Sequence, residues 1–374
     1  MRFEKYPFEK LNELLADIRP NEKLSPLSLT IGEPQFPTPA FIQEELAKNA
    51  HLLNKYPKTA GEEDLRRSVK EFVKQRFGIA LEEEQFVLSF GTRELLFNFP
   101  QYLLVNKSAP VMAFTNPFYQ IYEGAAIAAG ASVRYLDLTP HNSFKPQIDK
   151  SLERVDLVVL NFPNNPTASV LDQKELEEWV KAALEYDFVL LNDECYSEIY
   201  IDEPVSSLLQ ASKAVGNENF KNVLVVNSIS KRSSAPGLRS GFIAGDADIL
   251  REYRRYRTYV GCAAPLPLQK AAAVAWGDEE HVIQNRDRYR TNFKLAKEIL
   301  GTSIPKATFY LWLEVGDDEA FAKRAYERYN LKLLPGSYLG RNGVGRGFVR
   351  VALVYPEAKM KEALERLGEA MDER

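Results

Sequence analysis

Residues 223–241 read VLVVNSISKRSSAPGLRSG, in which four aliphatic residues precede a turn rich in serine, glycine and basic residues. The apolar run is continuous rather than alternating, which is typical of a strand buried on both faces of a parallel sheet. Runs of the same kind lie between turn signals at 86–90, 111–114, 157–160, 188–191 and 241–244. Residues 64–77 and 174–184 carry apolar side chains at the helical period instead. Because strand and helix alternate, the sequence predicts an α/β fold with a central sheet.

The C-terminal part of the chain changes character after Pro265 and Pro267. A long helical pattern from Ala271 to Leu300 precedes two expected strands and a charged helix, at 308–315, 349–354 and 357–371. We therefore expect a small α+β domain at 266–374 and a large domain at 45–265. Residues 1–44 include the segment IGEPQFPTPA, whose prolines exclude a helix or sheet interior. This arm is expected to pack on the small domain or to cross to a partner.

Composition excludes several functional classes. In 374 residues, 48 Lys and Arg face 52 Asp and Glu, so the net charge of −4 provides no basic field for nucleic acid or an anionic membrane. The two cysteines and three histidines are scattered, which predicts neither a metal site nor a disulfide framework. No apolar run approaches the roughly 20 residues that span a bilayer, and the N-terminus lacks the apolar core of a signal peptide. The sequence thus predicts a cytoplasmic protein.

The opening stretch also contains the residues best placed for chemistry. Ligands of α/β proteins bind beyond the carboxyl ends of the strands, and Lys231 follows such a strand closely. A lysine desolvated there can act as an imine-forming nucleophile and proton carrier, and nearby hydroxyls with Arg239 could bind a phosphate. A solvated, charged turn is the alternative interpretation, because lysine and arginine are mostly exposed.

Three other strand ends carry polar residues. Asp193 ends the run at 188–191 and could pair with a buried cation, such as the ring nitrogen of a pyridine cofactor, or simply cap the next element. Residues 161–168 read NFPNNPTA, a stiff loop with paired asparagines. Gly91, Thr92 and Arg93 open a helix, where free amides either seat a phosphate or form an ordinary N-cap.

Together these four segments resemble the class I and II aminotransferases, which are fold-type I pyridoxal-phosphate enzymes. The resemblance runs from about Leu29 to Val354 in the family order, and includes the SISK segment and the spacing of Gly237, Arg239 and Gly241. It implies a large domain with a mostly parallel central sheet flanked by helices, a smaller α+β domain, and pyridoxal 5'-phosphate as cofactor. It also implies a homodimer with active sites at the interface and small amino-acid and oxo-acid substrates.

The resemblance assigns roles to individual residues. Lys231 forms the Schiff base and moves the proton, and Arg350 grips the substrate α-carboxylate with help from the Gly32 backbone and Asn165. The ring of the cofactor contacts Asp193 at its nitrogen, Tyr196 and Asn165 at its phenolic oxygen, and Tyr119 at its face. Its phosphate is held by the backbone of Thr92 and Arg93, by Ser228, Ser230 and Arg239, and by Tyr56 from the neighbouring subunit. Ala168 departs from the family, in which most members carry glycine there.

Longer strings resemble the N-succinyldiaminopimelate aminotransferases in particular. They lie at 91–97, 116–126, 193–200, 230–233, 256–262, 307–312 and 334–339. That subfamily makes N-succinyl-LL-diaminopimelate from N-succinyl-2-amino-6-oxopimelate, with glutamate as amino donor, in lysine and cell-wall precursor synthesis. Because the substrate carries several carboxylates, Arg232, Arg257 and Arg341 are candidates for binding its distal acid groups.

Three alternatives remain open at this stage. An aspartate or broad-range aminotransferase would turn over aspartate with 2-oxoglutarate. A β-lyase on the same scaffold would release pyruvate and a thiol from cystathionine. An aminotransferase-like domain of a transcription regulator would carry an appended helix-turn-helix, which neither the start of the chain nor its acidic charge favours.

Overall fold

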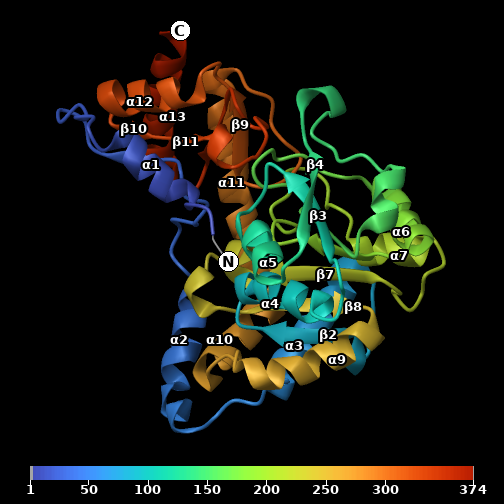
Figure 1. Ribbon diagram of the computed structural model, residues 1–374. Helices are drawn as coiled ribbons and strands as arrows, with labels where there is room; N and C mark the ends of the chain where they lie inside the picture. The colour runs from blue at the N-terminus through green and yellow to red at the C-terminus, as the bar shows by residue number, and fades with distance from the viewer. Residues whose placement is uncertain (1–2, 374) are drawn as a thin grey trace.

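The computed structural model describes residues 3–373 and contains a seven-stranded sheet at its centre (Figure 1). The strand order is β2-β8-β7-β6-β5-β3-β4; β8 is antiparallel to both neighbours, and the remaining pairs are parallel. The strands of this sheet are β2 (Phe86–Ser89), β3 (Val111–Asn116), β4 (Ser132–Asp137), β5 (Leu157–Leu160), β6 (Val189–Asp193), β7 (Val223–Ser228) and β8 (Gly241–Gly245). The predicted α/β fold with a mostly parallel central sheet is confirmed.

Helices cover both faces of this sheet. They are α2 (Ala40–Lys48), α3 (Glu63–Phe77), α4 (Thr92–Leu104), α5 (Ile121–Ala128), α6 (Gln173–Tyr186), α7 (Leu208–Ala214), α8 (Ile229–Arg232), α9 (Ala247–Val260) and α10 (Leu266–Gly277). Short 3₁₀ helices lie at Ala50–Asn54, Glu83–Gln85, Pro140–Asn142, Lys150–Arg154, Pro236–Leu238 and Gly336–Tyr338.

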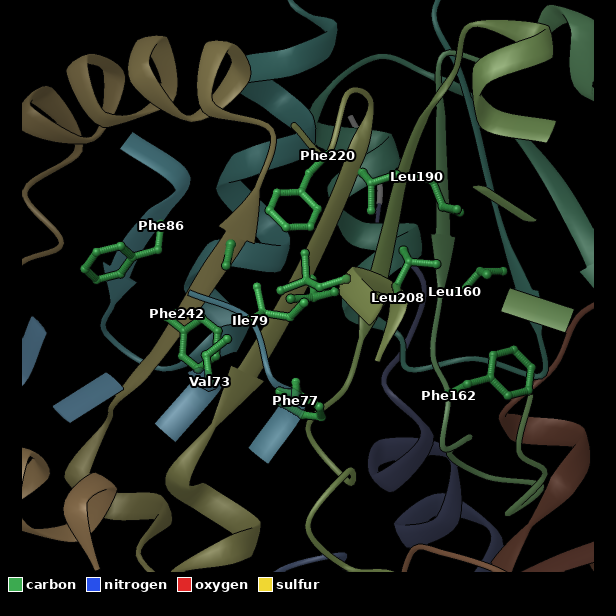
Figure 2. Close-up of a cluster of buried hydrophobic side chains, with 14 of the residues drawn as sticks. Val73, Phe77, Ile79, Phe86, Leu160, Phe162, Leu190, Leu208, Phe220 and Phe242 are labelled. Atoms are coloured by element: carbon green, nitrogen blue, oxygen red, sulfur yellow. The ribbon is translucent and has the colours of Figure 1, made fainter. Parts of the chain in front are cut away.

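Successive residues of β7 explain why the opening stretch is continuously apolar. Val223 and Val225 belong to the hydrophobic cluster shared with α3, α6, α7 and α10, whereas Leu224 and Val226 belong to the cluster shared with α4, α5 and α9. Alternate side chains of a strand point to opposite faces, so a strand covered on both faces is apolar at every position. Figure 2 shows part of the first cluster, including Val73, Phe77, Leu190 and Phe242.

The remaining elements form a second group beside the sheet (Figure 1). Its strands are β1 (Leu27–Ser28), β9 (Tyr310–Glu314), β10 (Leu331–Lys332), β11 (Leu334–Pro335) and β12 (Phe348–Ala352), in an antiparallel sheet of order β11-β12-β9 and a parallel pair β1-β10. Its helices are α1 (Pro7–Leu15), α11 (Glu280–Leu300), α12 (Asp318–Tyr329) and α13 (Glu357–Asp372). In the N-terminal arm, α1 contacts α12 and β11, and β1 pairs with β10.

One sequence-based expectation about elements is wrong, and one strand was not predicted. The single helical pattern from Ala271 to Leu300 is two helices, because the chain is extended at Asp278, which then hydrogen-bonds the amide of His281 at the start of α11. The edge strand β4 is absent from the prediction, since its side chains are mostly part-exposed and its sequence is not continuously apolar.

The division into an arm, a large domain and a small domain stays a prediction. One observation bears on its boundary: α10 contacts α2 and α3, and Ala271 and Trp276 are part of the cluster under the seven-stranded sheet. A domain boundary drawn from packing would therefore follow Gly277 rather than precede Leu266. No helix within residues 3–373 is long and apolar enough to cross a membrane.

Candidate active site

A cavity of about 600 Å³ opens where the sheet meets the C-terminal elements. The strands β5, β6 and β7 are parallel, and β2 runs in the same direction because β2 and β7 are both antiparallel to β8. Their carboxyl ends therefore share one edge, and the loops that follow them line the cavity. It brings together nearly all the predicted site residues, namely Gly32, Thr92, Arg93, Tyr119, Asn165, Asp193, Tyr196, Ser228, Ser230, Lys231, Arg239 and Arg350.

Lys231 lies in the wall of this cavity rather than on a solvated turn. It sits on the single turn α8 that directly follows β7, and its Nζ donates a hydrogen bond to the carbonyl oxygen of Gly32. Burial lowers the pKa of the Lys231 ammonium from 10.5 to about 8, although the carboxylate of Glu33 favours the charged form. About a tenth of this amine is therefore unprotonated at pH 7 and available as a nucleophile or base.

This lowered pKa has a measurable consequence. In cofactor-free protein, acetylation of Lys231 by acetic anhydride is expected to reach half its maximal rate near pH 8, because only the neutral amine reacts. Lys181 serves as an internal control, since it is exposed and Glu178 raises its pKa above 10.5. Peptide mapping by mass spectrometry across pH 6–11 follows both sites. Parallel pH profiles for the two lysines would contradict the desolvation of Lys231.

Asp193 provides a buried negative charge at the end of β6. Its carboxylate accepts hydrogen bonds from the Tyr122 hydroxyl (2.9 Å) and the Cys195 amide (3.2 Å), and only 5% of the residue is exposed. Burial raises the pKa of Asp193, while both hydrogen bonds oppose the rise. Within the described residues it has no Lys, Arg or His at ion-pair distance, so a cationic ligand group in the cavity would be its natural partner.

Tyr122 is a site residue that sequence reasoning missed. It is fully buried on α5 and holds Asp193 through its hydroxyl. The sequence could have indicated Tyr122 through its spacing from the predicted site residue Tyr119, because residues three apart lie on one face of a helical turn. Both rings line the cavity, and their centroids are 5.8 Å apart.

The N-terminus of α4 and the turn after β7 form an anion-binding corner. Gly91 is the N-cap of α4 with φ of 74°, and a Cβ there would lie 2.2 Å from Nη2 of Arg239. Arg239 itself has a left-handed φ of 53° and donates from Nη1 to the carbonyl of Pro236 at 2.7 Å. The Ser228 hydroxyl accepts from the Ser230 amide at 3.0 Å. Helix amides, hydroxyls and a guanidinium converge here, which suits a phosphate group.

Arg350 of β12 faces the opposite side of the cavity. Its Nη1 donates to Oδ1 of Asn165 at 2.8 Å, and its Nη2 donates to the carbonyl of Thr30 at 2.5 Å. The guanidinium carbon lies 4.6 Å from the ring centroid of Tyr310, and the buried Nε has no hydrogen-bond partner in the described structure. A guanidinium held on two sides with a donor to spare suits a carboxylate ligand.

Tyr310 closes this part of the cavity and was also missed from the sequence. Its hydroxyl lies 3.0 Å from that of Tyr196, and a Cβ on Gly32 would lie 1.8 Å from its oxygen. Gly32 is thus required by the close approach of an aromatic side chain. The string 307–312 contains Tyr310, but nothing local in it indicates which ring turns inward.

The structure contradicts the expectation that three further arginines bind distal acid groups of a substrate. None of them lines the cavity, and each is paired with a glutamate outside it: Arg232 with Glu279, Arg257 with Glu94, and Arg341 with Glu123. Arg232 and Arg257 are also almost fully buried. Breaking a largely buried ion pair such as Arg257–Glu94 costs about 3–5 kcal/mol, and all three arginines are thus engaged in holding the fold.

Two other predicted positions behave differently from the rest. Tyr56 is fully exposed and lies outside the cavity of its own chain. Ala168 adopts a left-handed φ of 60°, a conformation that favours glycine, in a turn where its amide donates to the carbonyl of Asn164 at 3.0 Å.

Known proteins resemble the chain over almost its whole length. The family model described as "Aminotransferase class I and II" matches residues 25–367. An LL-diaminopimelate aminotransferase of Moorella thermoacetica is 30% identical over 97% of this chain and 95% of its own. The crystal structure of aminotransferase AspB from Helicobacter pylori is 49% identical, with a TM-score of 0.98 and complete coverage of both chains. An aminotransferase from Neisseria meningitidis is 38% identical, with a TM-score of 0.94 and 98% coverage of both.

Proposed function

Because the chain belongs to the class I and II aminotransferases, which depend on pyridoxal 5'-phosphate, we propose that it interconverts two substrate pairs. These are N-succinyl-2-amino-6-oxopimelate with L-glutamate, and N-succinyl-LL-diaminopimelate with 2-oxoglutarate. This is a step of diaminopimelate and lysine synthesis. The proposal also retains the cytoplasmic location expected from the sequence, where the free Cys195 and Cys262 would stay reduced.

The cavity fits the cofactor by the chemistry of its groups. Asp193 is a buried carboxylate without an ion-pair partner in the described chain, and the α4 N-terminus with Arg239 forms an anion cradle that a side chain on Gly91 would fill. Asp193 would hold the ring nitrogen, Tyr196 and Asn165 the phenolic oxygen, and Tyr119 the ring face. Thr92, Arg93, Ser228, Ser230 and Arg239 would hold the phosphate. When bound, pyridoxal phosphate supplies a sink for the electrons left at the substrate α-carbon.

The residues of the chain perform the remaining tasks. Lys231 Nζ would accept the proton of the substrate α-carbon and later release that proton on the same side of the substrate. A pKa of about 8 allows this amine both to take up and to release a proton near neutral pH. Arg350 would pair with the α-carboxylate and so orient the α-carbon toward Lys231, with Asn165 and the Gly32 backbone beside it. The observation that carries the proposal is this meeting of Lys231, Asp193 and Arg350 in one cavity.

We also propose a homodimer in which Tyr56 completes the site of the partner. Tyr56 is fully exposed, and the large apolar side chains of Leu53 and Tyr259 are 74% and 92% exposed. Such side chains would be withdrawn from water in a dimer, which supports this proposal. A tyrosine that serves no site in its own chain is suited to reach the phosphate in another.

The choice of substrate rests on sequence similarity and on the size of the cavity. The strings that resemble N-succinyldiaminopimelate aminotransferases support the succinylated substrate, and a cavity of about 600 Å³ has room for a long side chain beside the cofactor. A second candidate is LL-diaminopimelate itself, because the Moorella relative carries that name. The aspartate or broad-range and β-lyase alternatives also remain for experiment.

Stopped-flow spectra of the cofactor-loaded enzyme distinguish these candidates. We expect N-succinyl-LL-diaminopimelate and glutamate to convert the cofactor rapidly to its amine form, with aspartate slow. Faster conversion by LL-diaminopimelate than by its succinyl derivative would favour the second candidate. Fast aspartate without a response to the succinylated amine would favour an aspartate or broad-range enzyme, and pyruvate release from cystathionine would favour a β-lyase.

A further inference from the structure

The turn that carries Lys231 is too short to be stable by itself. α8 has four residues, and the amide of Ser233 closes it by donating to the carbonyl of Ile229 at 2.9 Å. An isolated helical turn is unfavourable, because it fixes several backbone dihedrals for few hydrogen bonds. Contacts between α8 and the rest of the protein therefore set the direction of the Lys231 side chain.

Arg232, the residue next to Lys231, provides one set of these contacts. It is 1% exposed, and its guanidinium carbon lies 4.8 Å from the ring centroid of Phe72 on α3 and 5.2 Å from that of Trp276 on α10. A planar guanidinium stacks well on aromatic rings, whereas the ammonium of lysine is a point charge without such a plane. Both rings therefore restrict where the guanidinium can lie.

The break between α10 and α11 supplies hydrogen-bond acceptors for this guanidinium. Nη1 donates to the carbonyl of Ala275 at 2.8 Å, and Nη2 donates to the carbonyl of Asp278 at 3.4 Å and to the carboxylate of Glu279 at 3.0 Å. Carbonyls in the last turn of a helix lack partners within the helix, and the helix dipole favours a cation beside them. A continuous helix would use the carbonyl of Ala275 itself. The break thus creates the site for Arg232.

The start of α11 also holds the main chain that follows Lys231. Nδ2 of Asn285 donates to the carbonyl of Arg232 at 2.9 Å. The Ser233 hydroxyl lies 2.8 Å from Nε2 of His281, whose Nδ1 hydrogen-bonds the carboxylate of Asp278. The side chain of Arg232, its carbonyl and the next residue are therefore all fixed to the junction of α10 and α11.

Glu279 links this junction to a second part of the site. Its carboxylate also accepts from Nη2 of Arg286 at 3.3 Å, and Nε of Arg286 donates to the carbonyl of Glu198 at 3.1 Å. Glu198 lies two residues after Tyr196, which lines the cavity. One glutamate thus connects the segments that carry Lys231 and Tyr196.

We propose that Arg232 is a positioning residue for the proposed reaction, which fixes the α8 turn so that Lys231 is held in the wall of the cavity. Arg232 itself is outside the cavity lining, so it acts only through Lys231. Glu279 supports Arg232 from the junction of α10 and α11. The inference rests on the proposed function for the task of Lys231, but the contacts that carry it involve only the chain itself.

Acetylation of Lys231 in cofactor-free protein tests this without turnover. Arg232→Met keeps a flexible side chain beside the two rings but removes every donor. Because the side chain of Glu279 is 48% exposed, the variant leaves no buried charge unpaired and should fold. A looser turn admits water to the amine, so the pH of half-maximal acetylation should rise by about one unit. An unchanged profile would overturn the inference.

Two variants separate position from charge. Arg232→Lys keeps the positive charge but loses the planar fork, so it should show an intermediate rise. Glu279→Ala removes a negative charge, which by charge alone would lower the pKa of Lys231, whereas a looser turn would raise it. We therefore expect the pH of half-maximal acetylation to rise in both variants. A wild-type profile in Arg232→Lys, or a fall in Glu279→Ala, would make charge rather than position responsible and end the proposal.

Arg366→Met is the matched control. Arg366 of α13 is almost as buried as Arg232, pairs with the half-exposed Glu362, and donates to the carbonyl of Tyr329 at the end of α12 at 3.1 Å. Both arginine variants should lower the melting temperature by similar amounts, since each removes a buried guanidinium with its hydrogen bonds. Only Arg232→Met should change the profile of Lys231. The same change in Arg366→Met would attribute the effect to general destabilisation instead.

The glutamate half-reaction separates this inference from the proposed function. At saturating glutamate, the Arg232→Met holoenzyme should react about 10- to 100-fold more slowly, because a small misplacement of a reacting group costs that much. The apparent Kd for glutamate should stay close to the wild-type value, since Arg350 is unchanged. Weaker binding without a slower maximal rate would contradict the inference. A wild-type enzyme inert toward glutamate would instead refute the proposed function, while the acetylation profiles would still decide the role of Arg232.

Discussion

Replacing Lys231 with alanine is expected to lower the rate of the glutamate half-reaction by about 10⁴-fold, because one amine serves both as nucleophile and as proton carrier. No other lysine is among the described residues that line the cavity, so no neighbouring amine can take over. The variant should still bind pyridoxal phosphate, but weakly, since the contacts to the ring and phosphate remain. The absorbance band of the lysine-bound cofactor should be absent.

Stopped-flow absorbance with glutamate measures this loss. Lys181→Ala on the exposed side of α6 is the control and should react like the wild-type enzyme. Added methylamine should restore part of the proton transfer in Lys231→Ala, because a small amine can enter the space left by the side chain. Normal transamination by Lys231→Ala would end the assignment of this residue.

The second large effect is expected at Asp193. Asp193→Asn keeps the size of the side chain but removes the buried negative charge that would face the ring nitrogen. Removing one partner of a buried charge pair costs about 3–5 kcal/mol, which corresponds to about 10²- to 10⁴-fold in cofactor affinity and turnover. Fluorescence titration with pyridoxal phosphate measures the affinity, and stopped-flow absorbance measures the half-reaction.

Tyr122→Phe provides the matched comparison, because it removes only one hydrogen bond to the same carboxylate. The loss should be about tenfold, as expected for a hydrogen bond to a charged group. That bond favours the ionised carboxylate, so its removal raises the pKa of Asp193 further. The pH below which cofactor affinity falls should therefore move upward in Tyr122→Phe. Equal losses in Asp193→Asn and Tyr122→Phe, without a shift in pH dependence, would contradict a role for the charge.

The arginines show where sequence reasoning stops. Arg232, Arg257 and Arg341 occur in strings similar to those of succinyldiaminopimelate enzymes, yet each points to a glutamate outside the cavity. The partners of Arg257 and Arg341 are Glu94 and Glu123, which are 163 and 218 positions away in the chain. No local pattern reports a pairing over such distances.

The sequence by itself determined the α/β fold and the chemistry at the strand ends. Continuous apolar runs identify strands covered on both faces, and the residues that follow β2, β5, β6 and β7 reach one edge because these strands run in the same direction. Lys231 and Asp193 could therefore be predicted from local patterns. The tertiary structure decided which side chains complete the cavity, because Tyr122 and Tyr310 are brought into it by long-range packing. It also decided the break between α10 and α11 and the place of α10 under the sheet, since burial of an apolar face depends on what packs against it.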